Sequence, residues 1–151
     1  MDPDLIRKQL EAEYFHLQKT VEDFDNRSLH IKGWSVTFSL VQIAAGFGTK
    51  SPHIFLIAAL TAFLFWALET SWKGFQYAYN GRIREIEAYF SAEAPSSIRP
   101  FQITACWYET FHAEVVGRYF EFAKWPHVCM PHAVIVVLGL VFYMAHLIVE
   151  G

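Results

Sequence analysis

The residues with the strongest metal-ligating character gather toward the C-terminal end of the chain. His127, Cys129 and His132 fall within six residues, and Cys106 and His112 precede them. Thiolate and imidazole groups are the ligands that zinc and copper take from proteins, so these five residues could assemble a metal site. Their spacing matches no standard zinc motif. Boundary histidines and small apolar cysteines are the alternative interpretation, and we predict no resident metal.

A pair of histidines raises a second possible chemistry, haem ligation. His132 and His146 are 14 residues apart, almost four helical turns, and would lie on roughly one face of a helix. Membrane cytochromes hold haems with imidazoles at such separations, and His30 and His53 could supply partners. Each of these rings lies at an expected membrane boundary, where polar-tipped rings are common. The sequence therefore predicts no cofactor and leaves a haem- or metal-binding membrane subunit as an alternative.

Glu69 directly follows the apolar run at residues 54–68, at the end that we expect to face the cytoplasm. Glu69 stands in the segment Ala67-Leu-Glu-Thr-Ser-Trp72, directly after a stretch without charged residues. An ionisable group at the edge of a membrane-spanning segment is by default a functional hypothesis. Lys73 lies one helical turn further on, so an interfacial ion pair between the two side chains is the alternative.

Small and polar residues recur at helical spacing in the first apolar run. Ser35, Ser39, Gln42 and Gly46 follow one another at intervals of four, three and four residues, which places them on one helical face. Small and hydroxyl side chains let helices approach closely and form hydrogen bonds in a membrane. We predict that this face contacts neighbouring protomers and, together with Glu69, lines a path through a homo-oligomer.

No sequence pattern of an enzyme is present. The chain contains no dinucleotide fingerprint, P-loop, His-Glu-x-x-His pair or nucleophile elbow. Its net charge of −3 shows no basic excess for binding nucleic acid. We therefore predict that the protein is not an enzyme and makes no direct contact with nucleic acid.

Three apolar runs set the expected architecture. They cover residues 33–48, 54–68 and 128–149, and the last has no Asp, Glu, Lys or Arg across 22 residues. A helix of that length crosses a hydrocarbon core of ~30 Å. For the two shorter runs, a buried core helix is the alternative. We predict an all-α polytopic membrane protein with four parts: a cytoplasmic amphipathic helix (1–30), a transmembrane hairpin (31–72), a cytoplasmic helical module (73–125) and a third transmembrane helix (126–151).

Positive charge predicts the orientation of these crossings. Of 12 Lys and Arg residues, only Lys50 lies in the loop of the hairpin, and the other basic residues flank the runs on one side. By the positive-inside rule, the N-terminus and the 73–125 segment are cytoplasmic, and the C-terminus lies outside. The first 30 residues carry no apolar h-region, so we expect insertion through the internal segments.

The hydrophilic segments have an apolar seam at helical period. In the first helix the seam consists of Ile6, Leu10, Tyr14, Leu17, Val21 and Phe24. We expect the second crossing to continue as a helix to about Phe90, a linker at residues 91–100, and a third amphipathic helix from about Phe101 to Lys124. These seams could pack within one protomer or against neighbours.

The layout resembles the small membrane effector proteins of bacterial anti-phage systems linked to retrons, cyclic-nucleotide signalling and CRISPR. The resemblance lies in the charged N-terminal helix, the hairpin from Trp34 to Trp72 and the helical module at residues 82–124. It implies a pore-forming, oligomeric protein of the bacterial inner membrane that compromises the bilayer when a cytoplasmic trigger or protein partner arrives. A membrane anchor or accessory subunit of a larger complex is the alternative function.

Overall fold

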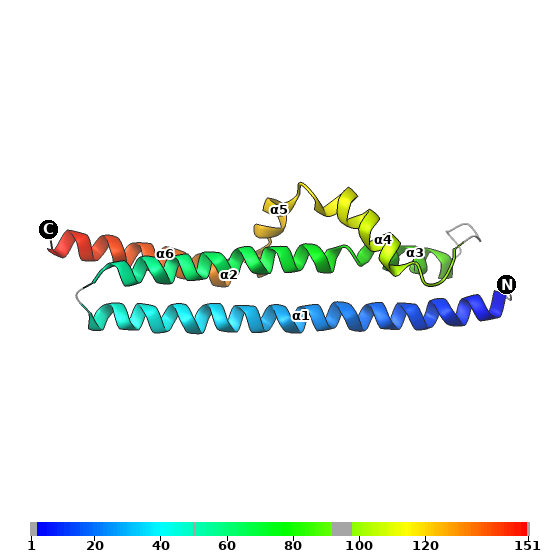
Figure 1. Cartoon of the computed structure of the whole chain (residues 1–151), viewed down its shortest axis with the longest axis horizontal. Coiled ribbons are helices and arrows are strands. Elements are labelled where there is room, and N and C mark those ends of the chain that lie inside the picture. Colours follow the sequence, from blue (N-terminus) through cyan, green and yellow to red (C-terminus); the bar gives the residue numbers. More distant parts are fainter. Residues whose placement is uncertain (1–2, 50, 92–97, 151) are drawn as a thin grey trace. The chain divides into compact units, whose positions relative to one another are not determined.

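The computed structural model describes residues 3–49, 51–91 and 98–150, and every regular element among them is a helix (Figure 1). The predicted all-α class is confirmed. In chain order the elements are α1 (Pro3–Gly48), α2 (His53–Tyr77), α3 (Asn80–Phe90), α4 (Ile103–Thr110), the π-helix η1 (Phe111–Val115), α5 (Tyr119–Ala123) and α6 (Pro126–Glu150).

The chain divides into two compact units. Unit 1 comprises Met1–Asn26 and Trp72–Tyr119, and unit 2 comprises Arg27–Ser71 and Phe120–Gly151. The helices α1 and α2 each contribute residues to both units. The amphipathic N-terminal stretch and the first apolar run, predicted as separate parts, are thus one unbroken helix of 46 residues.

Two helical stretches in the described part of the chain are long and apolar enough to cross a membrane: His53–Phe90, which holds α2 and α3, and Pro126–Val149 in α6. Three had been predicted. The predicted crossing at residues 33–48 of α1 is not one of these two stretches: the run has only 16 residues, and extending it toward the N-terminus takes in Lys32.

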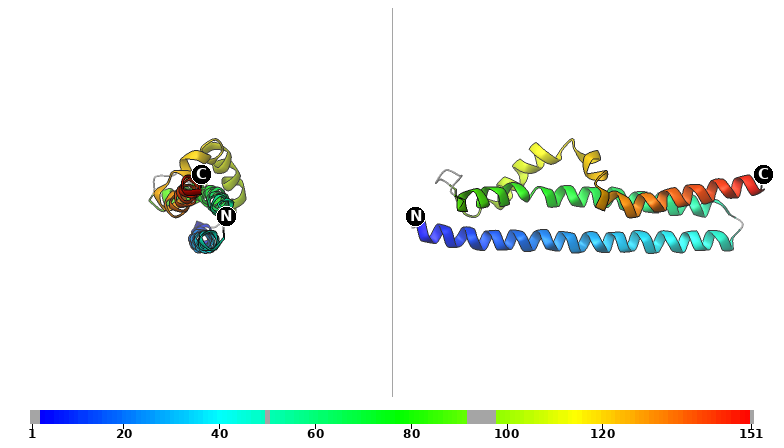
Figure 2. Two further views of the ribbon diagram at one scale, coloured as in Figure 1. Left: turned by 90° about the vertical axis from the view of Figure 1, so that its left-hand side faces the viewer. Right: turned by 180° about the vertical axis from the view of Figure 1, so that it is seen from behind.

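In unit 2, the C-terminal part of α1 lies beside α2 and α6 (Figures 1 and 2). Its apolar core consists of Ile43, Phe55, Ala58, Ala62 and Ile135. Glycine permits the close approach of α6 to α2, because a Cβ atom at Gly139 would stand 2.7 Å from the carbonyl oxygen of Phe55.

In unit 1, the apolar seam of α1 packs against α3. Leu10 and Leu17 are buried together with Ile83 and Ile86, and Ile6, Tyr14 and Val21 pack around them. Most of the apolar seam read from the sequence is therefore used within the chain.

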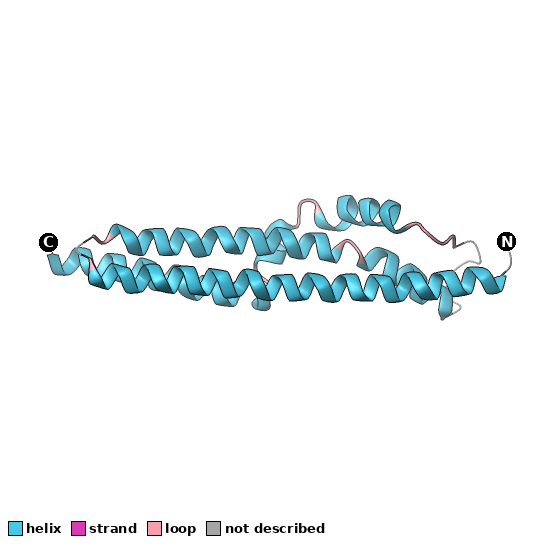
Figure 3. Cartoon of the chain, turned by 60° about the horizontal axis from the view of Figure 1, so that its bottom comes forward, coloured by secondary structure: helices cyan, strands magenta, loops and turns pink. Residues whose placement is uncertain are grey.

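The helix expected from Phe101 to Lys124 is wrong as a single element. The segment forms α4, η1 and α5, with a break at residues 116–118 (Figure 3). Val116 is extended, and Gly117 has φ +87°, a left-handed conformation that favours glycine. Residues 92–97 of the expected linker lie outside the described residues, and Ile98, Arg99 and Pro100 lie outside any helix.

Candidate functional site

A buried polar cluster in unit 2 surrounds the carboxylate of Glu69. One carboxylate oxygen accepts hydrogen bonds from Ser28 Oγ, at 2.7 Å, and from the ammonium group of Lys32. The other oxygen lies 2.8 Å from Nε2 of His132. On the far side of the ring, Nδ1 of His132 lies 2.8 Å from Oγ of Ser35. The five side chains form one continuous hydrogen-bonded chain, which we call the Glu69 cluster.

Three helices position this cluster. Ser28, Lys32 and Ser35 are spaced by four and three residues and therefore share one face of α1. Glu69 projects from α2, and His132 from α6. The side chains of Glu69 and His132 are fully buried, whereas that of Lys32 is 21% exposed. The cationic end of the cluster is therefore its most accessible point.

Burial of a carboxylate is costly unless the charge is matched and hydrogen-bonded. Lys32 supplies the opposite charge, and Ser28 and His132 occupy two further acceptor positions of Glu69. A neutral imidazole has one donor and one acceptor nitrogen. If Nε2 donates to Glu69, Nδ1 accepts from the Ser35 hydroxyl, so every polar group of the cluster has a partner.

The order serine, histidine, carboxylate is also that of a hydrolase triad. Here, however, the serine is not available to a substrate, because the Ser35 side chain is fully buried. A nucleophile must reach the reacting carbon atom. The arrangement is suited to holding and transferring protons rather than to acyl transfer.

The four residues of the predicted stripe lie on the side of α1 that faces into unit 2. Ser35 and Ser39 are fully buried, and Gln42 is half-buried and accepts a hydrogen bond from Thr61 Oγ1 at 3.1 Å. A Cβ atom at Gly46 would lie 2.6 Å from the ring of Phe55. The structure thus places this face against the other helices of the same chain.

Among the described residues, no group of three or more His, Cys, Asp or Glu side chains is arranged to hold a metal. The two ring nitrogens of His132 already lie within hydrogen-bond distance of Ser35 and Glu69. The thiol of Cys106 lies 3.1 Å from Glu85 Oε2 in unit 1, and burial, followed by the nearby Glu85 carboxylate, raises its pKa to about 11. A high thiol pKa disfavours the thiolate that metals bind.

Unit 1 has a buried ion pair of its own. The guanidinium of Arg82, 2% exposed, contacts Glu13 at 2.7 and 3.2 Å and Glu85 at 2.9 Å. It also donates to the carbonyl of Arg99, and the amide of Phe101 donates to Glu13. These bonds tie α1, α3 and the segment before α4 together, which is a structural role.

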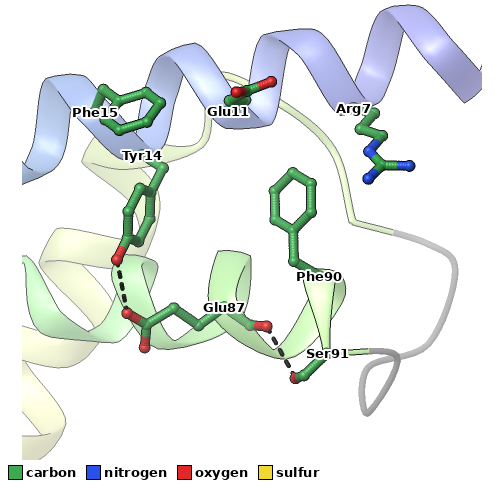
Figure 4. Close-up of a pocket in the computed structure, with 7 residues that line it drawn as sticks. All are labelled: Arg7, Glu11, Tyr14, Phe15, Glu87, Phe90 and Ser91. Atoms are coloured by element: carbon green, nitrogen blue, oxygen red, sulfur yellow. Dashed lines mark hydrogen bonds between the residues drawn. The ribbon is translucent and has the colours of Figure 1, made fainter.

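An open pocket of about 530 Å³ lies in unit 1 between α1 and the end of α3 (Figure 4). Tyr14 donates to Glu87 at 3.1 Å across it, and the Arg7 guanidinium lies 5.7 Å from the centre of the Phe90 ring. The residues that line it are Arg7, Glu11, Tyr14, Phe15, Glu87, Phe90 and Ser91. Both basic and acidic side chains line this pocket, so its charge does not favour one class of ligand.

Sequence reasoning missed the partners of Glu69. The expected partner, Lys73, instead contacts Asp25 at 2.5 Å and Gln76 at 2.7 Å in unit 1. Ser28 and Lys32 extend the Ser35 stripe toward the N-terminus at the same helical spacing, and this signal was available. His132 had been singled out as a candidate ligand, but its pairing with Glu69 could be found only from the packing of α6.

Comparisons with protein-family models, with curated proteins and with solved structures found no match to this chain. Its function is therefore inferred from the Glu69 cluster and from the surfaces of the two units.

Proposed function

We propose that unit 2 lies in a lipid bilayer and that the protein is a membrane effector, which oligomerises and perturbs the inner membrane when a cytoplasmic trigger arrives. The observation that carries the membrane part is the distribution of side chains in unit 2. A set of polar side chains is buried inside unit 2, while many large apolar side chains are exposed on its surface; the buried polar residues are Ser28, Ser35, Ser39, Glu69, Thr70 and His132. The exposed apolar side chains on α2 and α6 include Ile57, Leu60, Phe63, Leu64, Leu68, Val134, Val137, Val141, Met144, Leu147, Ile148 and Val149.

An apolar surface of this extent is unfavourable in water. Soluble monomers rarely expose a contiguous apolar area of more than a few hundred Å². Burying one such side chain in an apolar phase is worth roughly 1.5–3 kcal/mol, so a dozen of them strongly favour lipid over water. Helices whose backbone groups are satisfied internally are the elements that a bilayer accepts.

The same reasoning supports a third crossing by residues 31–48 of α1. Trp34, Phe38, Val41 and Phe47 are more than half exposed, whereas Ser35 and Ser39 face α2 and α6. Averaging over all faces of the helix lowers its hydropathy, but lipid would meet only the apolar face. Three crossings, with the basic residues inside, give a cytoplasmic N-terminus and an external C-terminus.

The effector role draws on unit 1 and on the continuity of two helices. Unit 1 carries most of the charged side chains, and α1 and α2 contribute to both units. A partner that bound unit 1 would act on the same helices that hold the Glu69 cluster. Three helices enclose no water-filled pore for solutes, although a chain of hydrogen bonds fits between them, so a homo-oligomer is part of the proposal. The resemblance to anti-phage effectors is the basis for proposing a role in anti-phage defence.

Inducible expression in a bacterium tests the proposal. We expect the full chain to remain in the pellet after alkaline carbonate washing, and triggered cells to lose membrane potential, followed with a potential-sensitive dye. Propidium uptake in the same cells reports whether larger solutes also pass. Recovery in the wash supernatant would contradict the bilayer placement. A membrane-bound chain that leaves the potential unchanged and co-purifies with one stable partner would favour an anchor subunit instead.

A further inference from the structure

We propose that the interior of unit 2 is a gated proton path, in which Glu69 and His132 carry the proton and Ser35, Ser39 and the Gln42–Thr61 pair form the relay beyond them. The inference rests on the proposed function and deepens it, because it names the proton as the species that crosses the membrane.

The path is a column of polar groups along one face of α1. From Ser28 through Lys32, Ser35 and Ser39 to Gln42, no gap exceeds four residues, so a polar side chain recurs on each turn. At 1.5 Å per residue the column spans roughly 21 Å of a hydrocarbon core of ~30 Å. The Glu69 cluster occupies one end of the column, and the Gln42–Thr61 hydrogen bond the other.

An unpartnered hydroxyl lies in the middle of this column. Ser39 is fully buried, and its Oγ has no hydrogen-bond partner among the described residues. Buried polar atoms are nearly always satisfied, by protein or by ordered water. Ser39 stands one turn from Ser35 and one turn from Gln42, so water held at Ser39 would join the two halves of the column into one hydrogen-bonded relay.

The Glu69 cluster can transfer a proton without a net chemical change in the protein. A proton arriving through Ser35 forms a bond to Nδ1 of His132, and the N–H bond at Nε2 breaks as its proton passes to Oε2 of Glu69. Rotation of the carboxyl group brings that proton to Lys32, whose ammonium group gives one of its own protons to water at the more accessible end and takes the Glu69 proton in its place. One proton enters for each that leaves, and return of the ring to its first tautomer resets the site.

The same groups disfavour metal cations. The charged and titratable side chains of the cluster are Lys32 from α1, Glu69 from α2 and His132 from α6. The Lys32 ammonium already neutralises the one carboxylate, and the remaining hydroxyls are too few to replace the hydration shell of Na⁺ or K⁺. Proton transfer needs only a continuous hydrogen-bonded chain.

An apolar plug closes the far end. At the level of Gly46, one turn beyond Gln42, lies the buried ring of Phe55, and the rings of Phe47 and Phe142 lie 5.2 and 5.7 Å from it. Hydrophobic constrictions gate channels by excluding water. The structure therefore corresponds to a closed path, and removal of the Phe55 ring is expected to open it.

Proteoliposomes test this directly. The full-length protein is reconstituted around pyranine, a potassium gradient with valinomycin sets an inside-negative potential, and internal acidification reports proton entry. We expect Phe55→Ala to raise the proton flux at least tenfold over the wild type. Adding His132→Gln should return it to the lipid background, and adding Ser39→Ala should reduce it several-fold.

His53→Gln in the Phe55→Ala background is the matched control, because His53 is an exposed histidine outside the column, and it should leave the flux unchanged. Phe142→Ala replaces Phe55→Ala if that variant does not reconstitute, and circular dichroism in each case verifies helical folding. A folded, inserted variant that conducts no protons, or one whose flux survives His132→Gln, would overturn the proton path.

Two further measurements distinguish failure of this inference from failure of the proposed function. Release of carboxyfluorescein or entry of Na⁺ at rates matching the protons would overturn proton selectivity while supporting a membrane effector. Failure of the wild-type chain to resist alkaline extraction from the vesicles would contradict the bilayer placement itself, and with it both proposals.

Discussion

Glu69 organises unit 2 at the level of single residues. Its carboxylate is shared by Ser28 and Lys32 from α1 and by His132 from α6, and it is fully buried. A buried charge of this kind stabilises a structure only while its partners remain, because removal of one partner leaves the other unmatched. The cluster therefore specifies which faces of the three helices meet.

Glu69→Gln is expected to destabilise unit 2 by about 3 kcal/mol, at the lower end of the range for broken buried pairs, because Lys32 is partly exposed. Thermal unfolding in detergent, followed by circular dichroism, measures the loss. Glu22→Gln, at an exposed position of α1, is the control and should leave the midpoint unchanged. Equal midpoints for the two variants would contradict the stabilising role of the cluster.

Gly139→Ala is expected to lower the unfolding midpoint, because the new Cβ atom would stand 2.7 Å from a backbone oxygen of α2, which cannot move aside as a side chain does. The control is Gly33→Ala, where no atom lies within 4 Å and the higher helix propensity of alanine should stabilise by up to about 1 kcal/mol. Opposite signs for the two shifts are the expected result, and equal shifts would contradict close packing at Gly139.

Cys106 is expected to react slowly with maleimides near pH 8, since burial and Glu85 raise its pKa to about 11. The thiolate is the reactive form, so its rate should increase with pH until that value. Glu85→Gln removes one of the two causes and should accelerate labelling at pH 8, measured by mass spectrometry of the Cys106 peptide. An unchanged rate would exclude an effect of Glu85 on the thiol.

At the level of elements, unit 1 depends on ties between short helices. The Arg84 guanidinium of α3 pairs with Glu114 of η1, which also accepts a hydrogen bond from Tyr77 at 3.1 Å. These bonds hold a π-helix whose C-terminal residue, Val115, is followed by the extended Val116. Contacts with neighbouring elements, rather than local propensity, thus account for this irregular segment.

Arg84 lowers the pKa of the Glu114 carboxyl. A carboxyl whose folded-state pKa is depressed adds stability above its ordinary pKa and loses it as the pH falls through the lowered value. The difference in unfolding free energy between wild type and Arg84→Gln should therefore be largest at neutral pH and vanish in acid. Urea unfolding at a series of pH values checks this, and a difference that is constant with pH would contradict it.

Some elements of the fold could be predicted from the sequence, and others could not. Uninterrupted apolar runs predicted α2 and α6. Apolar periodicity predicted the seam of α1 that contains Leu10 and Leu17, because burial along one face of a helix imposes a regular spacing. It did not predict the break at Gly117, where a single left-handed residue divides an otherwise helical pattern. Nor did it predict the pairing of Glu69 with His132, since contacts between distant segments depend on packing.

At the level of the whole molecule, the number of crossings decides where the ends of the chain lie. With three crossings, tags at the N- and C-termini should be reached from opposite sides of the membrane. With two crossings, by His53–Phe90 and Pro126–Val149 alone, both tags would be reached from one side. Protease protection of tags on inside-out and right-side-out vesicles distinguishes the two, and we expect opposite sides.

The outward-facing apolar side chains of unit 2 also have a consequence for genetics. In a water-soluble protein, substitutions at exposed positions are usually harmless, but a bilayer reverses that expectation. In a saturation-mutagenesis library scored for the abundance of full-length protein, Asp and Lys should therefore be depleted at Leu60, Val137 and Val141. Apolar residues should be retained at the same positions. The tolerance map would then outline the lipid contact residue by residue, without purification of the protein.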